Sequence, residues 1–128
     1  MKLIQHLIKA VRYALKGLQA TVTHQFAFQI ELALTIILVP LAYYWGESGV
    51  ERALLIMSWL LVLIVELLNS AVETTVDRIS REHHQLSGRA KDVASAAVLV
   101  SLLNAAVVWF IILSSHYANG ITAWYKFW

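Results

Sequence analysis

The chain of 128 residues contains no cysteine, and charged residues make up only 14% of it. Without a thiol, the chain can form no disulfide, thiolate metal site or cysteine nucleophile. It has neither a Walker loop of the form GxxxxGK(S/T) nor the glycine-rich pattern of protein kinases, so any nucleotide site must use another arrangement. Residues 1–20 also lack the apolar run and small-residue cleavage site of a secretory signal.

Apolar residues, in contrast, are abundant and make up 59% of the chain. Crossing the hydrocarbon core of a bilayer takes about 20 apolar residues in a helix. Three stretches meet this requirement: 26–45, 53–72 and 93–113. We predict an all-α membrane protein in which residues 1–128 form a single membrane domain, because so small a soluble domain could not bury this much apolar surface.

The first 24 residues predict a helix that lies on the membrane surface. Leu3, Leu7, Val11 and Leu15 recur at helical spacing, and the cationic side chains lie largely elsewhere around the same helix. Such a helix rests with its apolar side in the lipid and its charged side in water. It can serve as a simple anchor or as part of a lipid-using enzyme.

The distribution of charge predicts how the chain is oriented. Residues 1–24 carry four cations and no acid, and residues 77–92 carry four more cations. By the positive-inside rule, the N-terminus and a loop at 77–92 are cytoplasmic, and the C-terminus lies on the far side of the membrane. We therefore expect a multi-pass membrane protein. Its aromatic tail, 114–128, suits the far membrane interface.

A polar stripe marks the second predicted span. Glu66, Asn69, Glu73 and Asp77 stand at i, i+3, i+7 and i+11, which places them on one face of a helix over about 16 Å. Ionisable groups within a span are functional candidates. Glu73 and Asp77 repel each other unless a proton, a basic side chain or a metal ion lies between them, and magnesium suits such oxygen ligands.

Several of these residues also have a structural interpretation. Polar side chains in membrane helices often form hydrogen bonds between helices. For Ser95 and Asn104 this interpretation is the preferred one, whereas for Glu66 a functional role is preferred. For Glu31 the two interpretations are evenly balanced. The basic loop 77–92 can bind nucleotide phosphates or can simply be solvated.

Four segments resemble, in their order and spacing, the signature of the small prokaryotic diacylglycerol kinases. The resemblance covers roughly residues 6–113 and is supported upstream by Lys16-Gly17-Leu18 and Phe28. The segments are ELLNSAVE at 66–73, VDR at 76–78, LSGRAKD at 86–92 and SAAVL at 95–99.

This resemblance implies a homotrimer whose active sites lie between subunits near the cytoplasmic interface. It implies transfer of a phosphoryl group from ATP to the hydroxyl of diacylglycerol, with Mg²⁺ as cofactor and phosphatidate as product. The expected partners are therefore the membrane lipid, ATP and further copies of the chain. We expect no nucleic-acid partner.

The resemblance also implies roles for individual residues. The position of Glu66 is that of the general base, with Asn69 as a supporting polar group and Glu73 as the magnesium ligand. Positions near the lipid substrate are Glu31, Glu66 and Ser95. Positions that contact the nucleotide are Tyr13, Glu73, Glu82, His83, His84, Lys91 and Asp92.

Three positions depart from the family pattern. Gln25 stands where the family usually has a glutamate that shares the metal with the position of Glu73. His6 stands where an arginine is expected near the nucleotide phosphates, and Gln85 replaces a frequent acid. Because an amide is neutral and a poorer magnesium ligand, the sequence predicts reduced metal affinity.

Other functions are also compatible with the sequence. Within the same family, an undecaprenol kinase has a similar motif, although residues 87–89 and 95–97 look more like the diacylglycerol branch. From a different class, a stripe of membrane carboxylates can serve a small oligomeric ion channel or a proton-coupled transporter. A noncatalytic membrane subunit is a third alternative. Neither a channel or transporter nor a noncatalytic subunit explains why the acidic stripe adjoins a basic segment.

Overall fold

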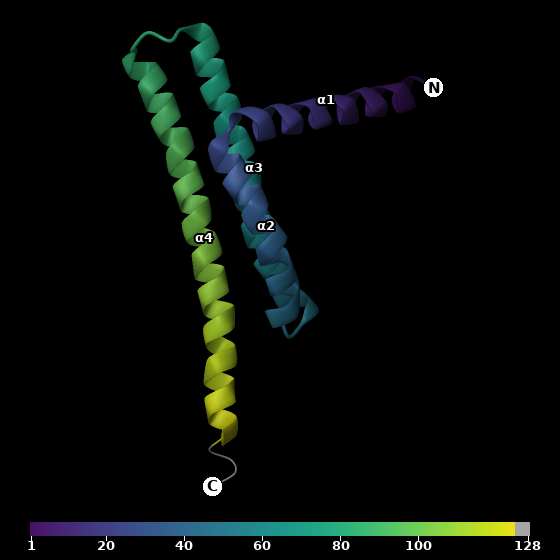
Figure 1. Cartoon of the computed structure of the whole chain (residues 1–128), viewed down its shortest axis with the longest axis vertical. Helices are drawn as coiled ribbons and strands as arrows, with labels where there is room; N and C mark the ends of the chain where they lie inside the picture. The colour runs from purple at the N-terminus through teal and green to yellow at the C-terminus, as the bar shows by residue number, and fades with distance from the viewer. Residues whose placement is uncertain (125–128) are drawn as a thin grey trace.

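The structure is a computed structural model that describes residues 1–124. Helices α2, α3 and α4 run alongside one another, while α1 leaves this bundle at a steep angle (Figure 1). The described residues contain no strand, which confirms the predicted all-α architecture. The helices are α1 (Lys2–His24), α2 (Phe26–Trp45), α3 (Gly49–Ile79) and α4 (Gln85–Trp124).

Three helices are long and apolar enough to cross a membrane, as predicted. They are Phe26–Trp45, Gly49–Ile79 and Gln85–Ala118, so the predicted stretches 53–72 and 93–113 lie inside longer helices. Tyr125, Phe127 and Trp128 of the aromatic tail lie outside the described residues.

The prediction of a loop at 77–92 is wrong over most of its length. Only residues 80–84 connect α3 to α4, and the flanking residues are helical. Hydropathy marks where a helix leaves the lipid, but a helix continues into water if its polar side chains support it. Here Lys91 Nζ donates a hydrogen bond to Asp77 Oδ1 at 2.6 Å, which joins the two helical extensions.

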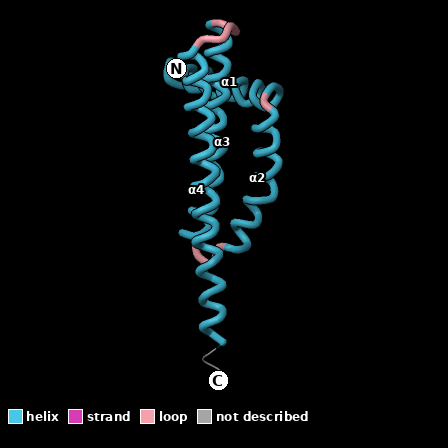
Figure 2. Tube along the Cα trace, turned by 90° about the vertical axis from the view of Figure 1, so that its left-hand side faces the viewer, coloured by secondary structure: helices cyan, strands magenta, loops and turns pink. Residues whose placement is uncertain are grey.

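Two breaks in the helices set the topology. Gln25 adopts an extended conformation between α1 and α2, and its N–H donates to the carbonyl of Thr21 at 2.9 Å. At the opposite end of α2, residues 46–48 form the turn into α3. We call the end with α1 and the α3–α4 connection the inner end, and the end with the α2–α3 turn the outer end (Figure 2).

The outer turn is tightly built. Ser48 Oγ accepts a hydrogen bond from the N–H of Glu51, and Glu51 Oε2 accepts one from the N–H of Glu47. These contacts satisfy donors at the start of α3 in the manner of an N-cap. Glu51 Oε2 also lies 3.0 Å from Nε2 of His116, which ties the turn to α4.

The buried apolar core is thin and lies towards the outer end. One cluster contains Ala42, Leu55 and Ile112, and a second contains Trp59, Val62 and Ala105. Both clusters combine α3 with α4, and most other large apolar side chains are exposed. In a membrane protein such exposed side chains face lipid or other helices, so this surface agrees with the three spans.

Candidate functional site

The inner half of α3 carries the predicted polar stripe, and burial changes along it. Glu66 and Asn69 are buried, with 4% and 7% of their surfaces exposed, whereas Asp77 is exposed. Glu73 is half-buried, and its Oε1 accepts a hydrogen bond from Asn69 Nδ2 at 3.4 Å. The stripe therefore connects the interior of the span to the surface at the inner end.

Glu31 lies on α2 and is buried, with 8% exposed. One turn further along α2, the hydroxyl of Thr35 donates to the Glu31 carbonyl and accepts a hydrogen bond from Trp59 Nε1 of α3. These bonds hold this part of α2 against α3. Among the described residues, the carboxylate oxygen Oε2 of Glu31 has no hydrogen-bond partner.

Unpartnered polar atoms recur in this region. Besides Glu31 Oε2, the buried atoms Asn69 Oδ1 and Ser70 Oγ have no partner within residues 1–124. A buried polar atom without a partner costs roughly 1–3 kcal/mol. A substrate, an ion or water can supply the missing partners, and this makes the inner half of α3 a candidate binding region.

Asp77 and Lys91 form an exposed ion pair between α3 and α4, with 2.6 Å between Asp77 Oδ1 and Lys91 Nζ. A basic side chain, one of the three ways to relieve repulsion between Glu73 and Asp77, is thus bonded to Asp77. The pair also holds Lys91 beside the end of the polar stripe. Asp92, the next residue, is exposed.

The α3–α4 connection contains the three predicted nucleotide contacts Glu82, His83 and His84, and all three are exposed. His84 Nδ1 accepts a hydrogen bond from the N–H of Leu86 at 3.1 Å, so this nitrogen stabilises the start of α4. The N–H of Glu82 donates to Ser80 Oγ at 3.0 Å. These bonds order the connection and leave the carboxylate of Glu82 at the surface.

The remaining predicted residues do not meet the stripe within the described chain. Tyr13 and His6 are exposed on α1, whose N-terminal end projects away from the bundle (Figure 1). Ser95 is exposed on α4. Sites built from these residues would need closure of α1 or a neighbouring copy.

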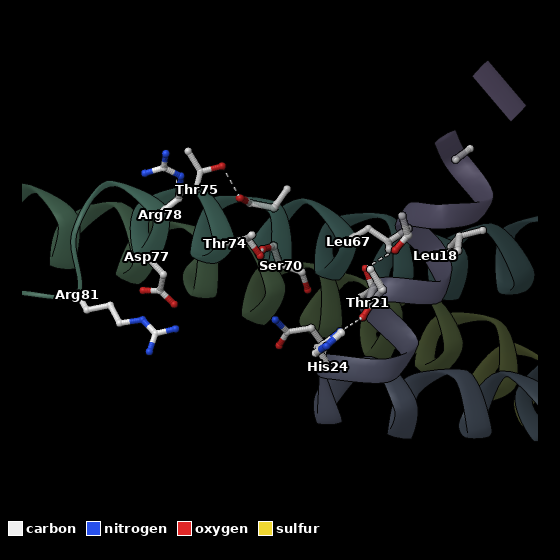
Figure 3. A pocket seen from close by; sticks show the side chains of 15 residues that line it. Leu18, Thr21, His24, Leu67, Ser70, Thr74, Thr75, Asp77, Arg78 and Arg81 are labelled. Carbon is white, nitrogen blue, oxygen red and sulfur yellow. Dashed lines mark hydrogen bonds between the residues drawn. The ribbon is translucent and has the colours of Figure 1, made fainter. Parts of the chain in front are cut away.

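A cavity of about 1140 Å³ lies between α1 and the inner half of α3 (Figure 3). Gln25 and Asp77 of the polar stripe are the residues predicted from the sequence pattern that line it. Arg81, which also lines it, belongs to the basic segment that can bind phosphates. Thr21, His24 and Thr74 had no functional signal in the sequence. These three come from two helices about 50 residues apart, and only the packing of α1 on α3 brings them together.

The residues fit magnesium only in combination with a ligand. No group of three or more acidic or histidine side chains within the described residues could hold a metal ion. Magnesium, however, is usually bound by one or two carboxylates together with phosphates and water. Glu73 supplies such a carboxylate, and the unpartnered Oδ1 of Asn69 is a further hard oxygen in the same helical turn.

The family model of prokaryotic diacylglycerol kinases matches residues 12–113. The diacylglycerol kinase of Haemophilus influenzae is 49% identical over 106 residues, covering 83% of this chain and 90% of that protein. The diacylglycerol kinase of Escherichia coli K12 is 47% identical over 111 residues, covering 87% of this chain and 91% of that protein. The diacylglycerol kinase of Pseudomonas aeruginosa is 46% identical over 110 residues, covering 86% of this chain and 89% of that protein.

Proposed function

Because this chain belongs to the prokaryotic diacylglycerol kinase family, we propose that it phosphorylates diacylglycerol with ATP along the inner half of α3. The products are phosphatidate and ADP. The observation that carries the proposed location is the graded polar stripe, which runs from the buried Glu66 to the exposed ion pair of Asp77 and Lys91. A lipid hydroxyl can approach from one end and a nucleotide from the other.

In this mechanism Glu66 is the general base. Its carboxylate takes the proton from the hydroxyl of diacylglycerol as the hydroxyl oxygen bonds to the γ-phosphorus of ATP, and the bond from that phosphorus to the β,γ-bridging oxygen breaks. Phosphoryl transfer depends mainly on positioning and charge stabilisation. Asn69 supports the site by donating a hydrogen bond to Glu73.

Glu73 and Asn69 would hold Mg²⁺, with Gln25 as a further, neutral ligand. When bound, the ion neutralises charge on the nucleotide phosphates. Lys91 supplies a cation for these phosphates and is already held near the stripe by Asp77. Glu31 and Ser95 contact the lipid substrate. The remaining proposed nucleotide contacts are Tyr13, Glu82, His83, His84, Asp92 and His6.

The proposed assembly is a homotrimer in the bacterial inner membrane, with the inner end in the cytoplasm. Exposed Tyr13 and Ser95 support shared sites, because each needs a neighbouring element to reach a substrate. The positive charge of α1 supports the orientation. Mass measurement in mild detergent that finds only monomers would contradict the trimer, and labelling of Lys2 from the periplasm would contradict the orientation.

The decisive experiment measures ATP-dependent phosphorylation in mixed micelles, with diacylglycerol and undecaprenol offered separately. We expect phosphatidate as the main product and a loss of about 10²-fold or more in rate for Glu66→Gln, since a general base contributes on that order. The matched control is Gln19→Glu, a substitution on exposed α1. A preference for undecaprenol would overturn the assignment of diacylglycerol as substrate. Full activity of Glu66→Gln would overturn the assignment of Glu66 as the general base.

The alternatives are not favoured. The matching relatives are diacylglycerol kinases over most of their length, which leaves no support for a channel or transporter. The undecaprenol kinase remains the comparison arm of the experiment above.

A further inference from the structure

Of the residues that line the cavity between α1 and α3, the proposed phosphoryl transfer involves only Gln25, as a metal ligand, and Asp77, as the partner of Lys91. None of Glu66, Asn69 and Glu73 lines it. Its α3 residues include Leu67, Ser70 and Thr74, which lie on the neighbouring face of the same helix. The cavity therefore opens beside the polar stripe, and its contents need a separate explanation.

The two ends of the cavity differ in character (Figure 3). Leu18 of α1 and Leu67 of α3 line one end, and Arg78 and Arg81 line the other. Leu67 lies within the apolar stretch of α3, whereas Arg78 lies about 16 Å further along the helix and Arg81 follows its end. The cavity thus extends from the depth of the acyl chains to the depth of the lipid headgroups.

Three polar side chains of the cavity have no partner that the described residues supply. Ser70 is 5% exposed, lines the cavity between its two ends, and its Oγ makes no hydrogen bond among the described residues. Arg78 and Arg81 form no ion pair within residues 1–124. Asp77, the acid that lines the cavity beside them, is engaged by Lys91. The cavity therefore has unused cations at one end and an unused hydroxyl in the middle.

We propose that this cavity binds a phospholipid, with its phosphate held by Arg78 and Arg81. Arginine matches the geometry of phosphate because it presents several N–H donors in a planar fork. Ser70 Oγ donates to an ester oxygen of the lipid, and an acyl chain lies against Leu18 and Leu67. The binding of this lipid does not depend on the proposed reaction.

Other ligands leave part of the cavity without a role. A nucleotide has no long apolar portion to cover Leu18 and Leu67, and neutral diacylglycerol leaves both arginines without an anion. A lipid with a phosphate group satisfies both ends. Phosphatidate carries a terminal phosphate and phosphatidylglycerol an internal one, so both share the required chemistry.

The test is a titration of the full-length protein in detergent micelles with phosphatidate, followed by native mass spectrometry in the absence of ATP. We expect saturable binding to the wild type and affinity at least about tenfold lower for the double variant R78Q/R81Q, with partial rescue in R78K/R81K. S70A should weaken binding about threefold or more, in line with the loss of one hydrogen bond. The matched charge control is K2Q/K9Q, on the exposed face of α1.

Further arms distinguish the source of the phosphate. Phosphatidylglycerol should compete with phosphatidate, whereas phosphatidylcholine should compete less and soluble glycerol 3-phosphate should not compete. Equal losses in R78Q/R81Q and K2Q/K9Q would overturn the proposal, because binding would then reflect overall charge. Full displacement by glycerol 3-phosphate would indicate a phosphate site without lipid specificity, which would also overturn it.

Location is tested with a phosphatidate that carries a photoreactive group on its acyl chain. We expect the lipid to cross-link to residues near Leu18 and Leu67. Absence of these cross-links, with a second copy of the chain covering the cavity, would contradict the proposal. Circular dichroism of each variant checks that it is folded. Binding by R78Q/R81Q is measured without ATP, whereas Glu66→Gln is used only in the rate measurement, so a failure of the proposed catalysis would not be mistaken for a failure of this site.

Discussion

At the scale of single residues, the inner half of α3 contains polar atoms whose partners the described chain does not supply. Glu31 Oε2, Asn69 Oδ1 and Ser70 Oγ are buried and unpartnered. By contrast, the indole N–H groups of Trp59 and Trp109 both have acceptors, Thr35 Oγ1 and the Leu55 carbonyl. These two tryptophans in the packed part of the bundle therefore have hydrogen-bond partners, whereas the three unpartnered atoms lie where we place ligands.

Gln25 permits a direct test of the metal assignment. We expect Gln25→Glu to lower the Mg²⁺ concentration for half-maximal activity by about threefold to tenfold, because a carboxylate is a stronger magnesium ligand than a neutral amide. The measurement is the initial rate at fixed ATP over a range of Mg²⁺ concentrations.

The control for this variant is Gln19→Glu, which adds the same charge to the exposed surface of α1. An equal shift in the two variants would show that the charge acts from a distance. No shift in either would remove Gln25 from the metal site.

Single residues also show how much of the site can be predicted from the sequence. The spacing of Glu66, Asn69 and Glu73 was enough to predict a shared face, because helical periodicity is local information. The pairing of Asp77 with Lys91 was not predictable, since it depends on how far α3 and α4 continue beyond the lipid. Thr21 and His24 have no periodic or motif signal, and only tertiary packing brings them to one cavity with Arg81 of the basic segment.

At the scale of elements, the turn between α2 and α3 depends on one glycine. A Cβ on Gly46 would lie 2.6 Å from Arg52 Cγ and 3.0 Å from both the Ala42 carbonyl oxygen and the Arg52 nitrogen. Arg52 Nε also donates to the Gly46 carbonyl at 2.9 Å, which keeps that side chain close. The turn therefore leaves no room for a larger residue without movement of the backbone.

We accordingly expect Gly46→Ala to lower the free energy of unfolding by about 1–3 kcal/mol, the usual range for overpacking. Gly49→Ala is the matched control, because a Cβ there meets nothing within 4 Å and Gly49 begins the helix. Unfolding in mixed micelles of detergent and sodium dodecyl sulfate, followed by circular dichroism, measures both. Equal stability of the two variants would show that the turn tolerates a side chain at position 46.

The element scale also shows where hydropathy is informative. It predicted α2 with its bounds, because this helix begins and ends at the edges of its apolar stretch. It did not predict the extensions of α3 and α4, since their polar turns look the same as a loop in a hydropathy profile. Charge patterns alone cannot separate a solvated helix end from a solvated loop.

At the scale of the whole molecule, packing and chemistry occupy different ends. The two apolar clusters lie towards the outer end, whereas most buried residues of the inner half of α3 are polar. Stability should therefore respond mainly to substitutions in the outer half, and activity to those in the inner half.

Leu55→Ala tests this separation. Leu55 is fully buried between Ala42 and Ile112, and removing its side chain should destabilise the protein by about 2–5 kcal/mol. The rate per folded enzyme should stay unchanged, because Glu66 lies about 16 Å further along α3. Met57→Ala, at a position that is 65% exposed, should change stability by less than about 1 kcal/mol. Unfolding curves and initial rates on the same preparations provide both readouts.

The off-axis course of α1 has a mechanical consequence. Because α1 joins the bundle through the single extended residue Gln25, a change in its tilt would widen or narrow the cavity while α2, α3 and α4 stayed in place. Lateral pressure in the surrounding leaflet acts on a helix that lies at its surface. The tilt at this one hinge therefore couples the course of α1 to the width of the cavity.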